Sequence, residues 1–242
     1  MMDPRHSGSH ETQPFEVGLK FSFHRFRKLR MYFAWLFVIT LAVFAKSTTQ
    51  GFWTGAPIIL AGEAIRIWSH GYLRKARQLA TNGPYAYVRN PLYLGNFLIG
   101  FGFCLIIWHP IIGVVFAIGF FSVYWLTVKG EEQRLAFKFG EAYADYLRNV
   151  PRFLPRLNPY KQSAKTPFAF HRVWGHGEHI TILAILSLFL ALYLRQEFYQ
   201  NHKPLTATSF VLLGLNAGVV ILSVVALAAR GFRSKRRLRL KG

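Results

Sequence analysis

The sequence is poor in cysteine and in acidic residues. Its one cysteine, Cys104, lies inside an apolar run, which excludes a disulfide framework and a cysteine metal site, so we expect a packing role. Asp and Glu together number 10 against 30 Lys and Arg, which leaves a formal net charge of +20. No small-residue cleavage pattern follows the first apolar segment, so we predict no cleavable signal peptide.

Apolar residues dominate the rest of the chain, at 52% of the sequence. High hydrophobicity and high net charge conflict in a soluble domain, but they agree in a membrane protein. There, apolar runs of roughly 17–25 residues cross the bilayer and positive charge stays in cytoplasmic loops. The basic residues punctuate apolar segments and form no single face, which argues against nucleic acid as a partner. We therefore expect an all-α polytopic membrane protein.

The apolar runs predict about six transmembrane helices by the usual length rule. They cover residues 31–45, 52–68, 92–108, 111–128, 180–194 and 206–229. A basic collar at residues 24–30 precedes the first run, and basic residues also follow the last one. Positive charge remains on the cytoplasmic side, so both termini are expected in the cytoplasm and the protein in a bacterial inner membrane.

Changes in composition divide the chain into five parts. We predict a mobile polar tail (1–23), the first two transmembrane helices (24–70), a core with a polar loop, a helical hairpin and an amphipathic segment (71–157), a connecting loop with two further transmembrane helices (158–229), and a basic cytoplasmic tail (230–242). The basic tail directly follows an apolar run, which predicts contact with anionic lipids.

Two opposite charges, Glu63 and Arg66, lie inside the second apolar run at a spacing that puts them on one helical face. Because charges within a membrane are costly unless they are paired, we interpret them as a mutual ion pair, with contact to a substrate as the alternative. His176 and His179 have a permissible spacing for metal ligands, but no third ligand appears at a matching interval. We therefore predict no metal site.

The segment 83–96, GPYAYVRNPLYLGN, joins a basic polar loop to the third apolar run. Asn90 and Pro91 predict a helix start, because asparagine caps free N–H groups and proline at the first position gives up an N–H that is unpaired anyway. The positive end of a helix dipole favours an anionic group. Gly95 leaves space for close backbone approach. We predict that a cofactor binds here.

Two adjacent carboxylates, Glu131 and Glu132, follow the hairpin that turns at His109-Pro110. The positive-inside argument brings both ends of the hairpin to the cytoplasmic side, so these carboxylates face the loop that contains Arg89. Neighbouring residues on a helix point about 100° apart, so the two have different roles. The alternative is an ordinary solvated position in the first turn of a new helix, where acidic residues favour the dipole.

The stretch from residue 131 to 155 is amphipathic. Leu135, Phe139, Tyr143 and Tyr146 are spaced to cover one side of a helix. We expect this segment to lie along the membrane surface and to close over the mouth of the hairpin, ending at Pro151 and Pro155.

Three segments together resemble the core of the isoprenylcysteine carboxyl methyltransferases and the related phospholipid methyltransferases. They are GPYAYVRNPLYLGNF, the WHPIIG turn and EEQRLAFKFGEAYADYLRNVPRFLP. The resemblance lies in order, spacing and topology, and it covers roughly residues 71–155. It implies that the chain uses S-adenosylmethionine without a Rossmann domain. The cofactor pocket would lie between the membrane helices and the cytosolic segment.

Carried over residue by residue, the resemblance implies a set of cofactor contacts. Those on the adenosine side would be Gln78, Leu79, Ala80 and Tyr85, and those around the amino-acid portion would be Asn90, Pro91, Leu92, Tyr93 and Gly95. Glu131 would meet the ammonium group. The chemistry agrees, since a carboxylate suits the ammonium and the sulfonium, while a helix mouth suits the cofactor's carboxylate.

The sequence departs from the family pattern at two positions. Asn90 replaces a histidine, which keeps a hydrogen-bonding side chain without a titratable group. Thr127 stands where the prenylcysteine enzymes have an arginine for the substrate carboxylate. Arg89 or Lys129 would take over that role, or the lipophilic acceptor is a phospholipid amine, a thiol or another lipid. In this hypothesis Arg89 orients the acceptor and Glu132 accepts a proton.

Two other functions remain open from the sequence. Membrane sterol reductases share part of this architecture and use NADPH, which makes a reductase an alternative by fold-level analogy. The other alternative is a non-catalytic lipid-binding membrane protein that keeps the pocket. It is supported by Asn90, which replaces the family's histidine.

Overall fold

The computed structural model describes residues 29–41, 46–74, 78–163, 166–202, 204 and 206–239, with side chains described as far as residue 225. The predicted tail 1–23, most of the basic collar and the last three residues lie outside the described residues. The elements are the helix Leu29–Leu41, α2 (Thr49–Tyr72), the 3-10 turn η1 (Gly83–Ala86), α3 (Pro91–Ile107), α4 (Pro110–Phe139), α5 (Glu141–Asn149), α6 (Phe170–His176), α7 (Glu178–Arg195), the π turn η2 (Gln196–Gln200) and α8 (Ala207–Arg239). The described part of the chain is thus all-helical, which confirms the predicted fold class.

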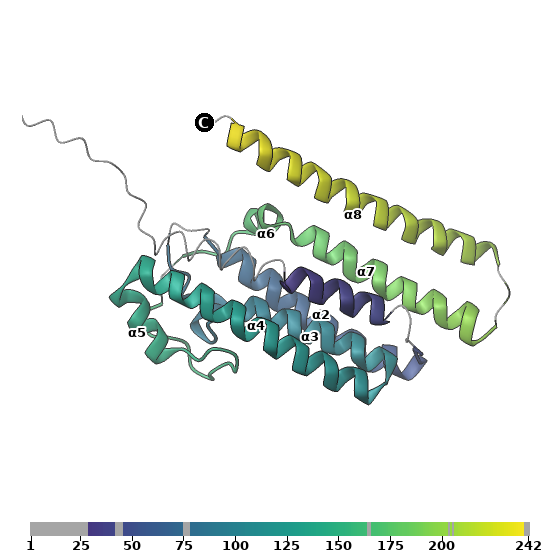
Figure 1. The fold of residues 1–242 in the computed structure, drawn as a ribbon, viewed down its shortest axis with the longest axis horizontal. Coiled ribbons are helices and arrows are strands. Elements are labelled where there is room, and N and C mark those ends of the chain that lie inside the picture. The colour runs from purple at the N-terminus through teal and green to yellow at the C-terminus, as the bar shows by residue number, and fades with distance from the viewer. Residues whose placement is uncertain are drawn as a thin grey trace, which may run out of the picture.

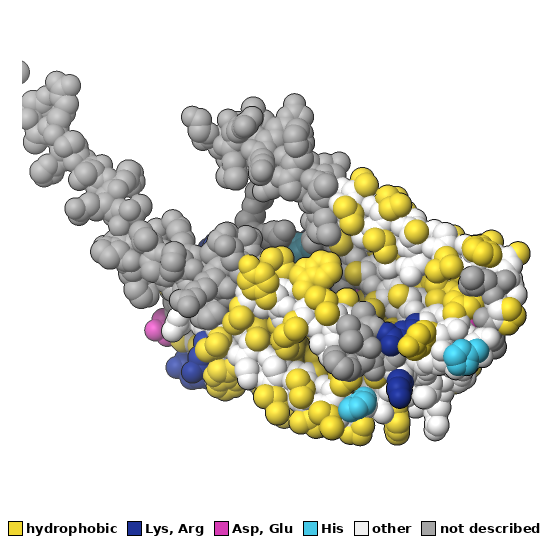
Figure 2. Space-filling view, turned by 45° about the vertical axis from the view of Figure 1, so that its right-hand side comes forward, with side chains coloured by type: hydrophobic (Ala, Val, Ile, Leu, Met, Phe, Trp, Pro, Cys, Tyr) yellow, Lys and Arg dark blue, Asp and Glu magenta, His cyan; other side chains and the backbone are white. Residues whose placement is uncertain are grey.

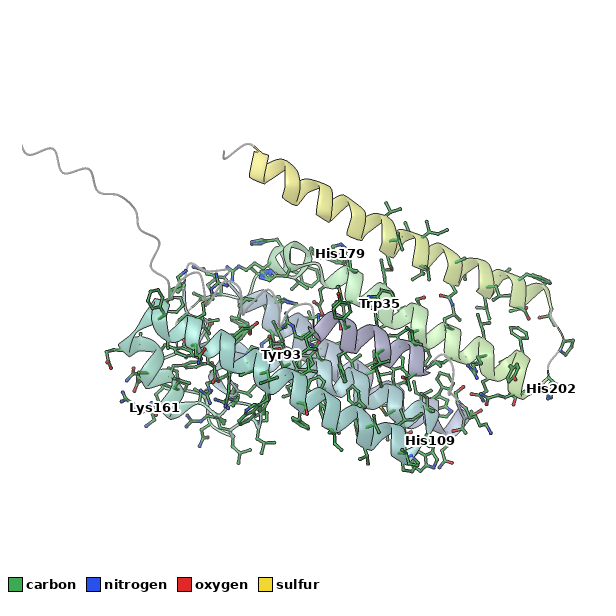
Figure 3. The ribbon with its side chains drawn as sticks, in the orientation of Figure 1. Trp35, Tyr93, His109, Lys161, His179 and His202 are labelled. Atoms are coloured by element: carbon green, nitrogen blue, oxygen red, sulfur yellow. The ribbon has the colours of Figure 1, made fainter. Side chains whose placement is uncertain are left out.

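The long helices run along one axis, with α8 at the edge of the bundle next to α7 (Figure 1). The short helices α5 and α6 lie at one end, which we call the α5 end. Lys161 marks this end in Figure 3, whereas His109 and His202 lie at the opposite end. Because α3 begins and α4 finishes at the α5 end, the two ends of the hairpin meet there, as the positive-inside argument predicts.

Within the residues that the structure describes, three helical stretches are long and apolar enough to cross a membrane: Pro110–Phe139, Glu178–Gln200 and Ala207–Val225. Leu29–Leu41 and Pro91–Ile107 are shorter apolar helices. Hydrophobic side chains are spread over much of the surface seen in Figure 2. On α4, for example, Ile111 is 68% exposed and Ile118 is 64% exposed, an arrangement that suits lipid better than water. The chain is an integral membrane protein, and the count of about six spans stays a prediction.

Helices α2 and α3 pack backbone against backbone through glycines. A Cβ added at Gly55 would lie 2.4 Å from the carbonyl oxygen of Gly102, and one at Gly62 would lie 2.7 Å from that of Gly95. Small residues permit this close approach between membrane helices. The backbone that comes close to Gly95 is therefore that of α2, on which Arg66 also lies against this glycine.

Several helix boundaries differ from the predicted ones. α4 continues without a break to Phe139, so Glu131 lies inside it and the interpretation as the first turn of a new helix is wrong. The sequence after Val128 is polar but rich in helix-forming residues, and a change in polarity alone does not end a helix. The break comes at Gly140, whose φ of 51° suits glycine. Likewise, α6 lies in the predicted connecting loop, and α8 extends to Arg239, into the predicted tail.

Candidate functional site

The loop that contains η1 leads into α3 at the α5 end. α3 begins at Pro91, which confirms the predicted helix start. The Asn90 side chain, however, makes no cap hydrogen bond, so that part of the prediction is wrong. Its Nδ2 instead donates to the carbonyl oxygen of Arg152 at 3.3 Å, because the chain after α5 passes beside the start of α3.

We call residues 150–161 the strap, because they lie along this loop and are joined to it by backbone hydrogen bonds. The Arg89 N–H donates to the carbonyl of Pro151 at 2.8 Å, and the Arg156 N–H to that of Tyr87 at 3.0 Å. The Tyr160 N–H donates to the carbonyl of Ala86 at 2.9 Å. The strap thus holds residues 86–89 in place.

The amphipathic face predicted between residues 131 and 155 packs under the same loop. Tyr143 and Tyr146 are buried in a cluster with Ala86 and Tyr160, and the partly buried residues around them include Leu135 and Phe139. The Tyr146 hydroxyl donates to the carbonyl oxygen of Tyr85 at 2.7 Å. The predicted apolar side is confirmed, although it is divided between α4 and α5 at Gly140.

Glu132 is held by two arginines. Arg152 makes a two-pronged contact, with its Nε 3.1 Å and its Nη2 2.6 Å from the two carboxylate oxygens. Arg89 Nη1 lies 3.2 Å from Glu132 Oε1, so the two residues that we predicted to face each other do meet. Sequence reasoning missed Arg152, since it follows α5 in an irregular segment that has no periodic signal.

Glu131, which is half-buried, points to a different set of partners. Arg30 Nη1 donates to the Tyr93 hydroxyl at 2.6 Å and lies 3.8 Å from Glu131 Oε1. The Tyr93 ring packs edge-on against Tyr124, with 4.9 Å between the ring centroids, and Figure 3 shows Tyr93 in the middle part of the bundle. Arg30 is a further residue that sequence reasoning did not assign to the site, because it counted only as part of the basic collar.

Three buried polar atoms around the loop have no hydrogen-bond partner: Asn82 Oδ1, Tyr85 Oη and Arg89 Nε. Leaving such a group unsatisfied costs about 1–3 kcal/mol, so each of these atoms is available to bind a polar ligand. Burial raises the pKa of the Tyr85 hydroxyl, which therefore remains protonated at neutral pH and able to donate.

The remaining predicted contacts lie around the same loop and the start of α3. Gln78 is exposed and its Oε1 accepts from Arg74 at 3.3 Å, while Leu79 packs against the Tyr143 cluster. Ala80 and Leu92 are half-buried, and Pro91 is buried. The loop, the α3 start and the last turns of α4 thus bring the predicted residues to one end of the bundle.

A second polar cluster ties α7 to α2. Arg66 Nε and Nη2 lie 2.6 and 2.8 Å from the two carboxylate oxygens of Glu178, which is 1% exposed. His70 Nδ1 lies 2.7 Å from the same carboxylate. The predicted partner Glu63 lies 3.6 Å from Arg66 Nε, so that ion pair is present but looser. Arg66 also donates to Asn96 of α3.

In the part of the chain that the structure describes, no three His, Cys, Asp or Glu side chains gather closely enough to hold a metal ion.

Breaking the Arg66–Glu178 pair is expected to destabilise the protein strongly. Arg66→Leu or Glu178→Leu alone leaves one buried charge without its main partner, which costs about 3–5 kcal/mol. Thermal unfolding in detergent measures the loss. The double variant Arg66→Leu/Glu178→Leu should recover part of it, because neither of these two charges remains, although their contacts with Glu63 and His70 are lost as well. Losses that simply add in the double variant would contradict a coupled pair.

A profile of the phospholipid methyltransferase family matches residues 51–142. Residues 51–142 are therefore similar to that family. The matched segment covers α2, α3, α4 and the first residues of α5, and so includes Tyr85, Arg89, Glu131 and Glu132. The match confirms the resemblance read from the sequence. The strap and α6–α8 lie beyond the matched residues.

Individual relatives fall into two groups by name. The cobalt-zinc-cadmium resistance protein CzcN of Cupriavidus metallidurans is 33% identical over 52% of this chain and 62% of the relative. The protein-S-isoprenylcysteine O-methyltransferase of Mus musculus is 37% identical over 34% of this chain and 29% of the relative. The Arabidopsis thaliana enzyme B of the same name is 28% identical over 54% of this chain and 74% of the relative. The alignments thus span less than two thirds of CzcN and of the mouse enzyme. No solved structure shows a significant match.

Proposed function

We propose that the protein is an S-adenosylmethionine-dependent methyltransferase of the bacterial inner membrane, with the α5 end in the cytoplasm. Its acceptor is a lipophilic molecule that reaches the site from the bilayer. The observation that supports this best is the group of unpaired buried polar atoms at Asn82, Tyr85 and Arg89, within the segment that matches the methyltransferase family. Both methyltransferase-named relatives and the family profile point to the same chemistry.

Different residues at the α5 end suit different parts of the cofactor. Gln78, Leu79, Ala80 and Tyr85 would line the adenosine side, where the orphaned Tyr85 hydroxyl can donate to a ring or ribose acceptor. The N-terminal end of α3, from Asn90 to Tyr93, would hold the carboxylate through its helix dipole. Glu131 would bind the ammonium group, with Arg30 and Tyr93 keeping its carboxylate in place.

When bound, S-adenosylmethionine supplies an activated methyl group on a sulfonium. The protein therefore has to align donor and acceptor and keep water away, and orientation of this kind can contribute roughly 7–11 kcal/mol at its favourable limit. Burial of Tyr93 and Tyr124 at the inner side of the site excludes water there. The strap lies along the loop and holds it by backbone hydrogen bonds.

Arg89 and Glu132 form the acceptor side of the proposal. Arg89 would orient an anionic or polar head group, and Glu132 keeps Arg89 in position. With an amine or thiol acceptor, Glu132 would also take up a proton. For that, one of its oxygens has to be released from Arg152 or Arg89, so exchange of these contacts would accompany acceptor binding.

The direct test is transfer of labelled methyl from S-adenosylmethionine into extracted native lipids and small thiols by protein reconstituted in nanodiscs. We expect a labelled lipophilic product, and its mass identifies the acceptor. A parallel titration with NADPH separates the reductase alternative, since saturable NADPH binding without S-adenosylmethionine binding would reverse the assignment. Cofactor binding with no product from any acceptor fraction would favour a non-catalytic lipid-binding protein.

A further inference from the structure

The strap carries two leucines that have almost no protein around them. Leu154 is 81% exposed and Leu157 is 96% exposed, and both lie in the sequence RFLPRLNPYK between Arg152 and Lys161. One exposed leucine needs no explanation, but two of them three residues apart in one ordered segment, flanked by basic residues, form a pattern that suits a membrane interface.

The contacts between the strap and α4 indicate how deep this part of the strap lies in the membrane. The ring centroid of Phe153 lies 6.1 Å from that of Phe121 and 6.4 Å from that of Trp125. Phe121 belongs to the apolar run 111–128, and at 1.5 Å per residue it lies about 10 Å inside the cytoplasmic end of that run. The Phe153 ring, next to Leu154 in the strap, therefore lies beside the apolar part of α4, below the level at which α4 becomes polar.

Several backbone positions of the strap have no unpaired N–H group, which makes its placement beside the apolar part of α4 less costly. Pro151, Pro155 and Pro159 have no N–H to leave unsatisfied, and the N–H of Arg156 is bonded to Tyr87. The Arg152 guanidinium lies over the Trp125 ring, 4.7 Å from its centroid, and Lys129 lies 5.5 Å from the same ring. A tryptophan beside basic side chains is typical of the membrane–water interface.

We propose that the strap is a re-entrant interfacial segment that inserts into the cytoplasmic leaflet of the bilayer. Leu154 and Leu157 enter the boundary between head groups and acyl chains, and the exposed Lys161 meets the lipid head groups. Because the strap is bonded to residues 86–89 and Arg152 is bonded to Glu132, the bilayer then supports the geometry of the loop directly. Any effect of the strap on how the acceptor reaches the site rests on the proposed function, whereas the insertion of the strap into the bilayer does not.

The test measures the depth of nitroxide labels in proteoliposomes. In a Cys104→Ala background, labels are attached to Leu154→Cys, Leu157→Cys and two references. Leu126→Cys, which is 47% exposed on α4, reports the lipid phase, and Glu141→Cys, exposed at the start of α5, reports water. The ratio of collisions with oxygen to collisions with a water-soluble nickel chelate is then compared between sites.

We expect the labels at positions 154 and 157 to favour oxygen at least 5-fold relative to the label at position 141, approaching the value at position 126. Equal nickel accessibility at positions 157 and 141 would overturn the proposal. Since Leu157 is almost fully exposed, its replacement should leave the fold intact, and each variant can be checked by size-exclusion chromatography. The measurement needs no turnover, so it stands or fails separately from the methyltransferase assignment.

Discussion

Replacement of Glu131 by glutamine is expected to weaken the binding of S-adenosylmethionine roughly 10- to 100-fold, because a hydrogen bond between charged groups contributes about 1.5–3 kcal/mol. The substitution keeps the shape of the side chain and removes the negative charge that would meet the ammonium and the sulfonium. Its geometry supports this role: Glu131 lies beside Arg30 and Tyr93 at a looser distance of 3.8 Å from Arg30, whereas Glu132 is occupied by Arg152 and Arg89. Isothermal titration calorimetry in nanodiscs gives the Kd.

The matched control is Glu141→Gln, which removes the same charge from an exposed position in the first turn of α5. It should bind the cofactor as the wild type does. A wild-type Kd for Glu131→Gln would remove this residue from the cofactor site. Equal weakening in both variants would point to the net charge of the α5 end and not to a specific contact.

Replacement of Gly55 by leucine is expected to destabilise the fold by at least about 3 kcal/mol, at the upper end of the usual cost of overpacking. Even a Cβ at this position would lie 2.4 Å from the carbonyl oxygen of Gly102 and 2.7 Å from the Ile106 side chain. The first of these neighbours is helix backbone, so α2 and α3 would have to separate. The loss should appear as a large fall in Tm and in the yield of monodisperse protein.

Gly214→Leu on α8 is the control for this prediction, since a Cβ there meets no atom within 4 Å. It should leave Tm close to that of the wild type. If the two substitutions lowered Tm equally, the cause would be a general effect of leucine in place of glycine, and the close contact between α2 and α3 would not be needed for stability.

The candidate site at the α5 end could be predicted from the sequence because the patterns that indicate it involve residues close together in the chain. Asn90-Pro91 marks a helix start through the chemistry of two neighbouring residues, and α3 begins there. The spacing of Leu135, Phe139, Tyr143 and Tyr146 follows the helical period, and their shared side is the one that packs. The meeting of Arg89 with Glu132 follows from hydropathy and the topology of one hairpin.

What the sequence by itself determined is therefore the all-helical membrane architecture and the segment that forms the candidate site, since both depend on hydropathy and on residues near one another in the chain. Only the tertiary structure decided the partners. Glu178 binds Arg66 from 112 residues away, and Arg30 and Arg152 reach the two glutamates from outside the matched family segment. These pairings depend on which faces of distant helices pack together, and no local pattern in the chain specifies that choice.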